Sequence, residues 1–333
     1  MRAAVTDGLG AVEVVDRPVP RPGAGQVLIA VGASGVCGTD LHVIDGSFTV
    51  GRYPVVPGHE FAGTVAGLGP GVAGPAEGTL VGVDPNLGCG SCRWCRARIK
   101  TLCPRLAPLG IVHDGAAAEY VVAPAELVVP LPDGLDAETG ALIEPLSCVL
   151  HAADRVAGWR DARVLVTGAG PIGLIAATVA KHLGAGHVEV VEPHAGRRER
   201  AAEFGADAAY ADAGELEIGE GIDIAVEASG HPAAVAAALG RLGTRGTLVQ
   251  MGVAAPEARV ALAPLDLFAK ELTIIGSMSL ADAYRPAAEL MADLAPVLAP
   301  LVTDRLPLDD YGEALRRLRS PDSLKVQVIP VSA

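Results

Sequence analysis

Four cysteines lie close together in one short stretch of the sequence. Cys89, Cys92 and Cys95 are separated by two residues each, and Cys103 follows after seven more. This spacing allows four thiolates to surround one Zn²⁺ on a loop over residues 86–104, with no open position for a substrate. Two disulfides or unrelated core cysteines are the alternatives, but adjacent C-x2-C pairs favour a metal. We therefore expect a structural zinc site on this loop.

A glycine-rich segment in the second half of the chain has the pattern of a dinucleotide-binding loop. Gly168, Gly170, Pro171, Ile172 and Gly173 follow an apolar run typical of a strand and open a segment with helical spacing. In such a loop the first glycine permits the turn, the second lets the backbone approach a pyrophosphate, and the third lets helix and strand pack closely. The helix start then offers free N–H groups to the phosphates. A flavodoxin-like sheet without a nucleotide is the alternative, which three correctly spaced glycines disfavour.

An acidic residue at the end of the next predicted strand bears on the choice of cofactor. Glu192 lies where a carboxylate is expected to accept hydrogen bonds from the adenosine ribose. A carboxylate there favours NAD and repels the 2′-phosphate of NADP. Arg197 and Arg198 follow and are able to host that phosphate, unless both lie on a solvated helix face. We expect NAD as the cofactor, with NADP less favoured.

Four further residues have the chemistry of a second metal site. Cys37 follows a predicted strand, His59 and Glu60 are adjacent in the segment PGHE, and Glu144 lies near a change of pattern along the chain. Each alone has an ordinary structural explanation as a core cysteine, a satisfied histidine or a helix start. Together they provide a thiolate, an imidazole and two carboxylates. Catalytic zinc is typically bound by three such side chains and keeps a fourth position open.

The predicted secondary structure that positions these residues differs between the two halves of the chain. The first half contains short β-like runs separated by glycine and proline, which predicts a compact β-barrel or rolled sheet. From Arg163 onward, strand-like and helical segments alternate, which predicts a doubly wound parallel sheet. The expected α/β chain has a β-rich catalytic domain over residues 1–148, a dinucleotide-binding Rossmann domain over 149–278, and a final segment, 279–333, that returns to the first domain.

The composition limits the kinds of partner. The 333 residues are half hydrophobic, and the formal net charge is −13. A chain this acidic is not expected to bind nucleic acid or an anionic membrane. No signal peptide or apolar run of about 18 residues is visible, so we expect a cytoplasmic protein. Its six cysteines would then stay reduced and available to metals.

Taken together, these motifs resemble those of the zinc-dependent medium-chain dehydrogenase/reductase family across essentially the whole chain. The segments GVCGTDLH, PGHE, the four-cysteine loop, EPL and GAGPIG occur in the order and at separations similar to the family's. The chain is similar to the polyol (sorbitol-like) and threonine dehydrogenase branch, because Glu144 stands where the simple alcohol dehydrogenases have a second cysteine ligand. The resemblance implies a GroES-like barrel for the catalytic domain and one catalytic and one structural zinc per chain.

The resemblance also implies the catalytic ligand set. Cys37, His59 and Glu60 would bind the catalytic zinc, and Glu144 would be a water-mediated or alternative ligand. Cys148, one helical turn after Glu144, is expected in the core.

The same resemblance implies roles for three residues that lie between Cys37 and His59. Thr39 would hydrogen-bond the substrate oxygen, and Asp40 would orient the zinc-bound histidine. His42 would end a proton relay through the cofactor ribose, with an ordinary surface histidine as the alternative.

The implied reaction is reversible oxidation of a secondary alcohol to a ketone, with hydride transfer to the nicotinamide. The expected substrate is a small polyol, cyclitol or amino alcohol. Sorbitol dehydrogenases carry Phe-Arg-Tyr where this chain has Met278-Ser279-Leu280, which weakens a sorbitol assignment. Phe48 and Tyr53 either line the pocket or are packing residues.

The sequence leaves several alternative functions open. The chain could be a general secondary alcohol dehydrogenase, a reductase of a carbonyl or an activated double bond without catalytic zinc, or a non-catalytic NAD-binding protein. The family precedent implies a homodimer or homotetramer. The strand-like segment ELTIIGS is able to extend a sheet across a two-fold axis.

Overall fold

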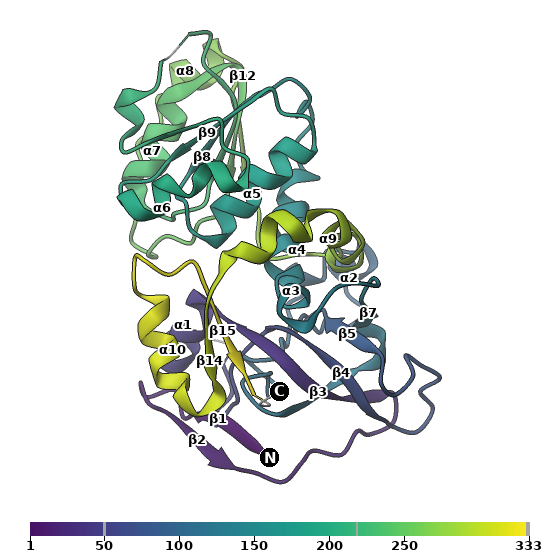
Figure 1. Cartoon of the computed structure of the whole chain (residues 1–333). Helices are drawn as coiled ribbons and strands as arrows, with labels where there is room; N and C mark the ends of the chain where they lie inside the picture. Colours follow the sequence, from purple (N-terminus) through teal and green to yellow (C-terminus); the bar gives the residue numbers. More distant parts are fainter. Residues whose placement is uncertain (49–50, 218, 331–333) are drawn as a thin grey trace. The chain divides into compact units, whose positions relative to one another are not determined.

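The computed structural model describes residues 1–48, 51–217 and 219–330 (Figure 1). The chain divides into two compact units, of which the first combines Met1–Ser147 with Ala281–Ala333 and the second is Cys148–Leu280. The domain boundaries expected after residues 148 and 278 lie within two residues of these divisions. Residues 331–333, at the end of the expected return segment, lie outside the described part of the chain.

The first unit is mainly β-structure. Its strands are β1 (Arg2–Thr6), β2 (Val12–Asp16), β3 (Gln26–Val36), β4 (Glu60–Leu68), β5 (Leu80–Val83), β6 (Tyr120–Pro124), β7 (Val128–Pro130), β14 (Val302–Pro307) and β15 (Lys325–Ile329). Strands β1 and β2 form an antiparallel pair of their own, and the others form a seven-stranded sheet in the order β14-β15-β3-β4-β5-β7, with β6 pairing with β3. The short, glycine-rich runs of the first half therefore form the expected rolled β-structure.

The long strand β3 organises this sheet. Its side chains alternate between the two faces, and Val27, Ile29 and Val31 enter a buried cluster with Phe61 and Val81. Strand β15 pairs antiparallel with the end of β3, so the last strand of the chain lies beside the segment that leads to Cys37.

The helices of this unit are short apart from two near its C-terminal end. They are α1 (Gly38–Ile44), α2 (Arg93–Arg96), α3 (Ala137–Gly140), α9 (Tyr284–Leu298) and α10 (Tyr311–Leu318), with 3₁₀ turns at Lys100–Leu102, Ala125–Leu127, Ala299–Leu301 and Leu308–Asp310. Helix α4 (Ile143–Ala153) contains the division between the units.

The second unit is an α/β domain with a parallel sheet. Its strands are β8 (Arg163–Thr167), β9 (His187–Val191), β10 (Ala208–Tyr210), β11 (Ile222–Glu227), β12 (Leu242–Gln250) and β13 (Thr273–Gly276). Its helices are α5 (Pro171–His182), α6 (Ala195–Glu199), α7 (Pro232–Arg241) and α8 (Pro264–Ala269), with 3₁₀ turns at Ala201–Phe204 and Ala213–Glu215.

The strand order β10-β9-β8-β11-β12-β13 is that of a doubly wound fold, as expected from the sequence. The chain runs outward from β8 through α5 to β9 and α6 to β10, and then from β11 through α7 to β12 and α8 to β13. Right-handed crossovers between parallel strands place these two pairs of helices on opposite faces of the sheet. The order reverses between β8 and β11. Ligands of such sheets bind beyond the carboxyl ends of the strands at this point.

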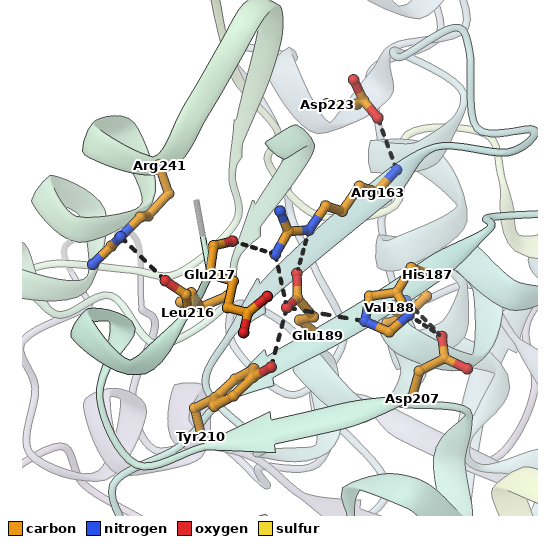
Figure 2. A network of polar contacts seen from close by, with 10 residues as sticks. All are labelled: Arg163, His187, Val188, Glu189, Asp207, Tyr210, Leu216, Glu217, Asp223 and Arg241. Carbon is orange, nitrogen blue, oxygen red and sulfur yellow. Dashed lines mark hydrogen bonds and ion pairs between the residues drawn. The ribbon is translucent and has the colours of Figure 1, made fainter. Parts of the chain in front are cut away.

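A buried polar network holds the first three strands of this sheet together (Figure 2). Glu189, in the middle of β9, is 1% exposed and accepts two hydrogen bonds from the Arg163 guanidinium, at 2.8 and 3.0 Å. The Tyr210 hydroxyl donates to the same carboxylate at 3.3 Å, and Arg163 also donates to the carbonyl of Glu217. The facing carboxylate raises the pKa of Arg163. The network therefore links side chains of the three neighbouring strands β8, β9 and β10.

Among the described residues, none of the helices is both long and apolar enough to cross a membrane.

Candidate active site and metal centres

The four-cysteine loop folds so that its sulfur atoms converge. The Sγ atoms of Cys89, Cys92, Cys95 and Cys103 all lie within 4.8 Å of one another. Tetrahedral zinc with Zn–S bonds of about 2.3 Å would require sulfur separations of roughly 3.8 Å. The six cysteines, which all lie in the described part of the chain, form no disulfide with one another. The arrangement therefore fits a zinc ion and needs only small adjustments to hold it.

Local hydrogen bonds prepare this cluster for a cation. The Cys95 and Cys89 backbone N–H groups donate to the sulfur atoms of Cys92 and Cys103, each at 3.4 Å. Backbone and hydroxyl donors of Ser91, together with Arg105, lower the pKa of Cys89 to about 5. Desolvation and the neighbouring Cys92 raise the pKa of Cys95 to about 11. Four crowded thiols cannot all ionise without a compensating charge, which a dication supplies.

A second group of candidate ligands forms where β3 ends and β4 begins. One ligand atom each from Cys37, His59 and Glu60 lies within 4.8 Å of the others. The antiparallel register pairs Gly35 with Glu60, which brings the start of α1 beside the PGHE segment. A Cβ atom at Gly35 would lie 2.3 Å from a Glu60 carboxylate oxygen, so only glycine leaves room for that side chain. Sulfur, imidazole and carboxylate donors of this kind are those of catalytic zinc sites.

Asp40 is the buried centre of this region. Its carboxylate is fully buried and accepts hydrogen bonds from the backbone N–H groups of Cys37, at 2.8 Å, and Gly58, at 3.2 Å. The Nδ1 atom of His59 lies 3.4 Å from the same carboxylate. Burial lowers the pKa of His59, but Asp40 and then Cys37 outweigh it, and the net pKa is raised well above its usual range. With Nδ1 facing Asp40, the Nε2 atom is the one left for a metal.

Lys325 also belongs to this site, although its sequence position gave no reason to expect it there. Its Nζ atom donates to both carboxylate oxygens of Glu60, at 2.9 and 2.7 Å, and both side chains are buried. Burial lowers the pKa of Lys325, but the Glu60 carboxylate outweighs it and raises the pKa above its usual range. The two residues are 265 positions apart and meet only because β15 pairs with β3. No local sequence signal would have revealed the pair.

The other residues predicted for this site, Thr39, His42 and Glu144, differ in their burial and contacts. Thr39 is half-buried, and its hydroxyl accepts a weak hydrogen bond from the Cys37 thiol at 3.8 Å. His42 is exposed, with Nδ1 3.0 Å from the Ser47 hydroxyl. Glu144, near the start of α4, is buried and is not in the 4.8 Å group, although its charge contributes to the raised pKa of Lys325.

Phe48 and Tyr53 have the packing contacts that were one of the two alternatives expected from the sequence. Both pack against a small buried cluster of Val43, Val55 and Ile111. The Tyr53 hydroxyl donates to the Val43 carbonyl at 2.7 Å. The two aromatic rings therefore support the α1 region by packing.

The glycine-rich segment forms the turn between β8 and α5. Gly168 has a φ of +98°, and a Cβ at Gly173 would lie 1.8 Å from the Gly168 carbonyl oxygen, so both positions require glycine. A Cβ at Gly170, which precedes the helix, would meet nothing within 4 Å, so the backbone is open to an approaching group there. Pro171 is the first residue of α5 and Ile172 the second. This loop fits a pyrophosphate at the helix start.

Glu192 lies beside this loop after β9. One carboxylate oxygen accepts a hydrogen bond from the Ala169 N–H at 2.8 Å, and the other accepts one from the His194 N–H at 2.9 Å. Arg198 donates to the backbone carbonyls of Glu192 and Pro193, both at 2.9 Å. Arg198 therefore supports the loop, and Glu192 keeps free lone pairs for a ribose.

Comparison with known proteins agrees with the folds of the first and second units. The family described as alcohol dehydrogenase GroES-like domain matches residues 23–133, and the family described as zinc-binding dehydrogenase matches residues 171–293. These matches confirm the expected GroES-like and Rossmann fold classes.

Individual relatives match over nearly the whole chain. A sorbitol dehydrogenase of Halalkalibacterium halodurans is 34% identical, with 97% of each chain covered. An L-threonine 3-dehydrogenase of Saccharopolyspora erythraea is 35% identical, with 96% of each chain covered. A protein of Sinorhizobium meliloti 1021, solved bound to NADP, superposes with a TM-score of 0.94 at 32% identity, with 99% of each chain covered. The chain is therefore an oxidoreductase that belongs to the zinc-binding alcohol dehydrogenase family, as its motifs predicted.

Proposed function

We propose that this chain is a zinc- and nicotinamide-dependent dehydrogenase that oxidises a secondary alcohol of a small polyol or amino alcohol. The observation that carries the proposal is the convergence of Cys37, His59 and Glu60 within 4.8 Å, in a chain that also has an open glycine-rich loop at a helix start. Relatives named for sorbitol and for threonine support a substrate with neighbouring hydroxyl or amino groups.

The metal site would be held by Cys37, His59 and Glu60. Zinc bound there would act as a Lewis acid and lower the pKa of the substrate hydroxyl. Asp40 keeps the histidine in the orientation that leaves Nε2 available. Thr39 offers a hydroxyl next to Cys37 that can accept the substrate proton in a hydrogen bond. His42 would exchange that proton with water, a role supported by its exposure and by its contact with the Ser47 hydroxyl.

Glu144 is the expected alternative ligand. It lies outside the group of three, and Lys325 already neutralises Glu60. A carboxylate held by a lysine is a weaker metal ligand than a free one, because its charge is shared. We propose Cys37, His59 and Glu60 as the ligands, with Glu144 as a water-mediated ligand or as the alternative to Glu60.

The cofactor site would consist of the loop from Gly168 to Gly173 together with Glu192. The nicotinamide supplies the hydride acceptor. The loop N–H groups would bind the pyrophosphate, and Glu192 would accept hydrogen bonds from the ribose, which would favour NAD. Arg197 and Arg198 both lie on α6, shortly after Glu192, and would be the arginines near a 2′-phosphate, should NADP bind.

The oligomer is proposed to be a homodimer or a homotetramer formed through the second unit. Strand β13 is the edge of the parallel sheet, and its Ile274 is 45% exposed. The preceding helix α8 exposes Leu265 (72%) and Phe268 (82%). An edge strand with apolar neighbours is able to pair with a second copy across a two-fold axis. A cytoplasmic location is proposed because the zinc loop needs four reduced cysteines.

The experiment that tests the function is nicotinamide absorbance against a substrate panel. Sugar alcohols, cyclitols, amino alcohols, threonine and simple secondary alcohols are each assayed with NAD and with NADP. Turnover of a polyol or amino alcohol with NAD supports the proposal. Activity on simple alcohols alone assigns a general alcohol dehydrogenase. Activity that persists in Cys37→Ser assigns a reductase without catalytic zinc, and cofactor binding without any turnover assigns a non-catalytic protein.

A further inference from the structure

Glu227 is a buried carboxylate at the carboxyl end of β11. It is the last residue of that strand and is 0% exposed. One oxygen accepts hydrogen bonds from the Ser229 N–H at 2.8 Å, the Gly230 N–H at 3.0 Å and the Ser229 hydroxyl, with the Thr167 hydroxyl at 3.4 Å. The other oxygen accepts from the Gln250 side-chain amide at 2.7 Å and from Gly230 at 3.1 Å. These donors are all neutral, so the charge is held by dipoles alone.

The donors come from three different connections of the parallel sheet. Thr167 ends β8 and precedes the glycine-rich loop, Ser229 and Gly230 follow β11, and Gln250 ends β12. The Glu227 backbone carbonyl also accepts from the Met251 and Gly252 N–H groups, both at 2.9 Å. One residue therefore joins the carboxyl ends of three neighbouring strands, including the two at which the strand order reverses.

Glycines allow these connections to converge on the carboxylate. A Cβ at Gly252 would lie 2.1 Å from the Gly230 nitrogen and 2.4 Å from a Glu227 oxygen. A Cβ at Gly168 would lie 3.2 Å from the Ser229 side chain. Ser229 itself is exposed. The segment that Glu227 holds therefore lies directly against the first glycine of the pyrophosphate loop and faces solvent.

We propose that Glu227 is a positioning residue for the nicotinamide cofactor, which fixes the connections after β8, β11 and β12 in the arrangement that binds it. This inference rests on the proposed function. The cofactor of a doubly wound sheet binds beyond these strand ends. Loops that carry many backbone polar groups and few apolar contacts are mobile unless something fixes them. A buried carboxylate with at least four donors fixes them without occupying the space of the ligand.

The proposal makes the charge and the acceptor capacity of Glu227 essential. In Glu227→Gln, an amide NH₂ would replace one of the two acceptor oxygens. It would face either the Gln250 amide or the Ser229 and Gly230 N–H groups. Gln250 cannot simply turn over to compensate, because its NH₂ also donates to the Gly252 carbonyl at 2.8 Å. The substitution therefore leaves donors facing donors at the junction of the loops.

The test compares cofactor affinity in three variants of the whole chain. NADH binding is measured by its fluorescence, and NAD binding by competition, together with the melting temperature without cofactor. Glu227→Gln is expected to weaken binding by roughly 10- to 100-fold, as for loss of hydrogen bonds to a charged group. Gln250→Met removes one donor and is expected to weaken binding by roughly 3- to 10-fold. Glu189→Gln, the same change at a buried carboxylate in the middle of β9 (Figure 2), is the control and should leave affinity within twofold.

Steady-state kinetics provide a second measurement. The KM for NAD should rise in Glu227→Gln more than kcat falls, whereas a general loss of folded enzyme lowers kcat alone. Equal affinity in the wild type, Glu227→Gln and Gln250→Met overturns the inference. So does an equal loss in Glu189→Gln, because it would mean that any buried carboxylate of this sheet has the same effect. If Glu227→Gln does not fold, Gln250→Met decides. A wild-type chain that binds neither NADH nor NADPH contradicts the proposed function instead.

Discussion

Asp40 shows how one buried side chain fixes both sides of the proposed catalytic metal site. It binds the backbone of Cys37 and of Gly58 and faces Nδ1 of His59. The thiolate and the imidazole are therefore held relative to each other by a single carboxylate. Opposite them, Lys325 holds Glu60. Lys325 therefore places one buried cation directly on the carboxylate of the proposed metal site.

His59→Ala should lower the zinc content from two ions per chain to about one and abolish turnover, because catalytic zinc typically has only three protein ligands. Metal analysis of the purified chain measures this directly. His113→Ala, at an exposed histidine outside the site, is the control. Two zinc ions retained in His59→Ala would disprove the ligand assignment.

Glu192→Ala should weaken NAD and improve NADP relative to it, since the change removes a ribose acceptor and a negative charge. Loss of hydrogen bonds to a charged group corresponds to roughly a 10- to 100-fold change. The two kcat/KM values measure the preference. Glu199→Ala, at an exposed acid on α6, controls for the general loss of charge. An unchanged NAD-to-NADP ratio would assign the preference to another residue.

At the level of elements, the four-cysteine loop behaves as a small lobe attached to the β-rich unit. Its helix α2 has only four residues and its 3₁₀ turn three, with few buried side chains of its own. An ion pair between the half-buried Lys100 and the buried Asp84 connects the lobe to the end of β5. Burial raises the pKa of Asp84, and Lys100 offsets part of that effect. So short an element has no core of its own, and we infer that metal binding provides most of its local stability.

Cys92→Ser should therefore unfold the lobe and leave the second unit folded. The variant should lose about one zinc per chain, because a structural site needs all four ligands. Trypsin should then cleave within residues 93–100, which carry several arginines and a lysine, at least roughly tenfold faster, because a locally unfolded segment is open to proteases. Cofactor binding should persist.

The matched control for this experiment is Cys148→Ser, at a half-buried cysteine outside both clusters. It should keep both zinc ions and the wild-type cleavage pattern. A Cys92→Ser chain that resists trypsin like the wild type would show that the lobe is stable without the metal.

At the level of the whole molecule, the two units have different internal construction. The first brings together segments from both ends of the chain, while the second is continuous from Cys148 to Leu280. The edge strand β13 of the second unit has a 45% exposed Ile274. In a chain that acts as a monomer, an edge strand beside exposed Leu265 and Phe268 would favour aggregation.

Phe268→Asp should shift the chain to a smaller assembly, from dimer to monomer or from tetramer to dimer, because a charge placed among apolar contacts at an interface costs about 2 kcal/mol or more. Sedimentation equilibrium at several concentrations measures the dissociation constant. Leu9→Asp, which changes an 84% exposed leucine of the first unit, is the control. A wild-type chain that is monomeric at all concentrations, or a variant with unchanged mass, would contradict the proposed interface.

The sequence determined those features that depend on local spacing. Cysteines two residues apart on a short loop lie close together, and glycines at 168, 170 and 173 between a strand-like run and a helical segment predict a turn before a helix. The alternation of strands and helices after Arg163 similarly determined the doubly wound sheet, because right-handed crossovers leave few other arrangements. These features depend on a few neighbouring residues and on backbone geometry.

Only the tertiary structure decided which distant residues meet. Lys325 reaches Glu60 because β15 pairs with β3, and Glu227 meets Thr167 and Gln250 because β11 lies between β8 and β12. Tyr53 could be assigned to packing only once its hydroxyl was seen on the Val43 carbonyl. Contacts between residues far apart in sequence depend on the pairing of whole strands, and the sum of many weak interactions that sets this pairing leaves no signal in any single segment.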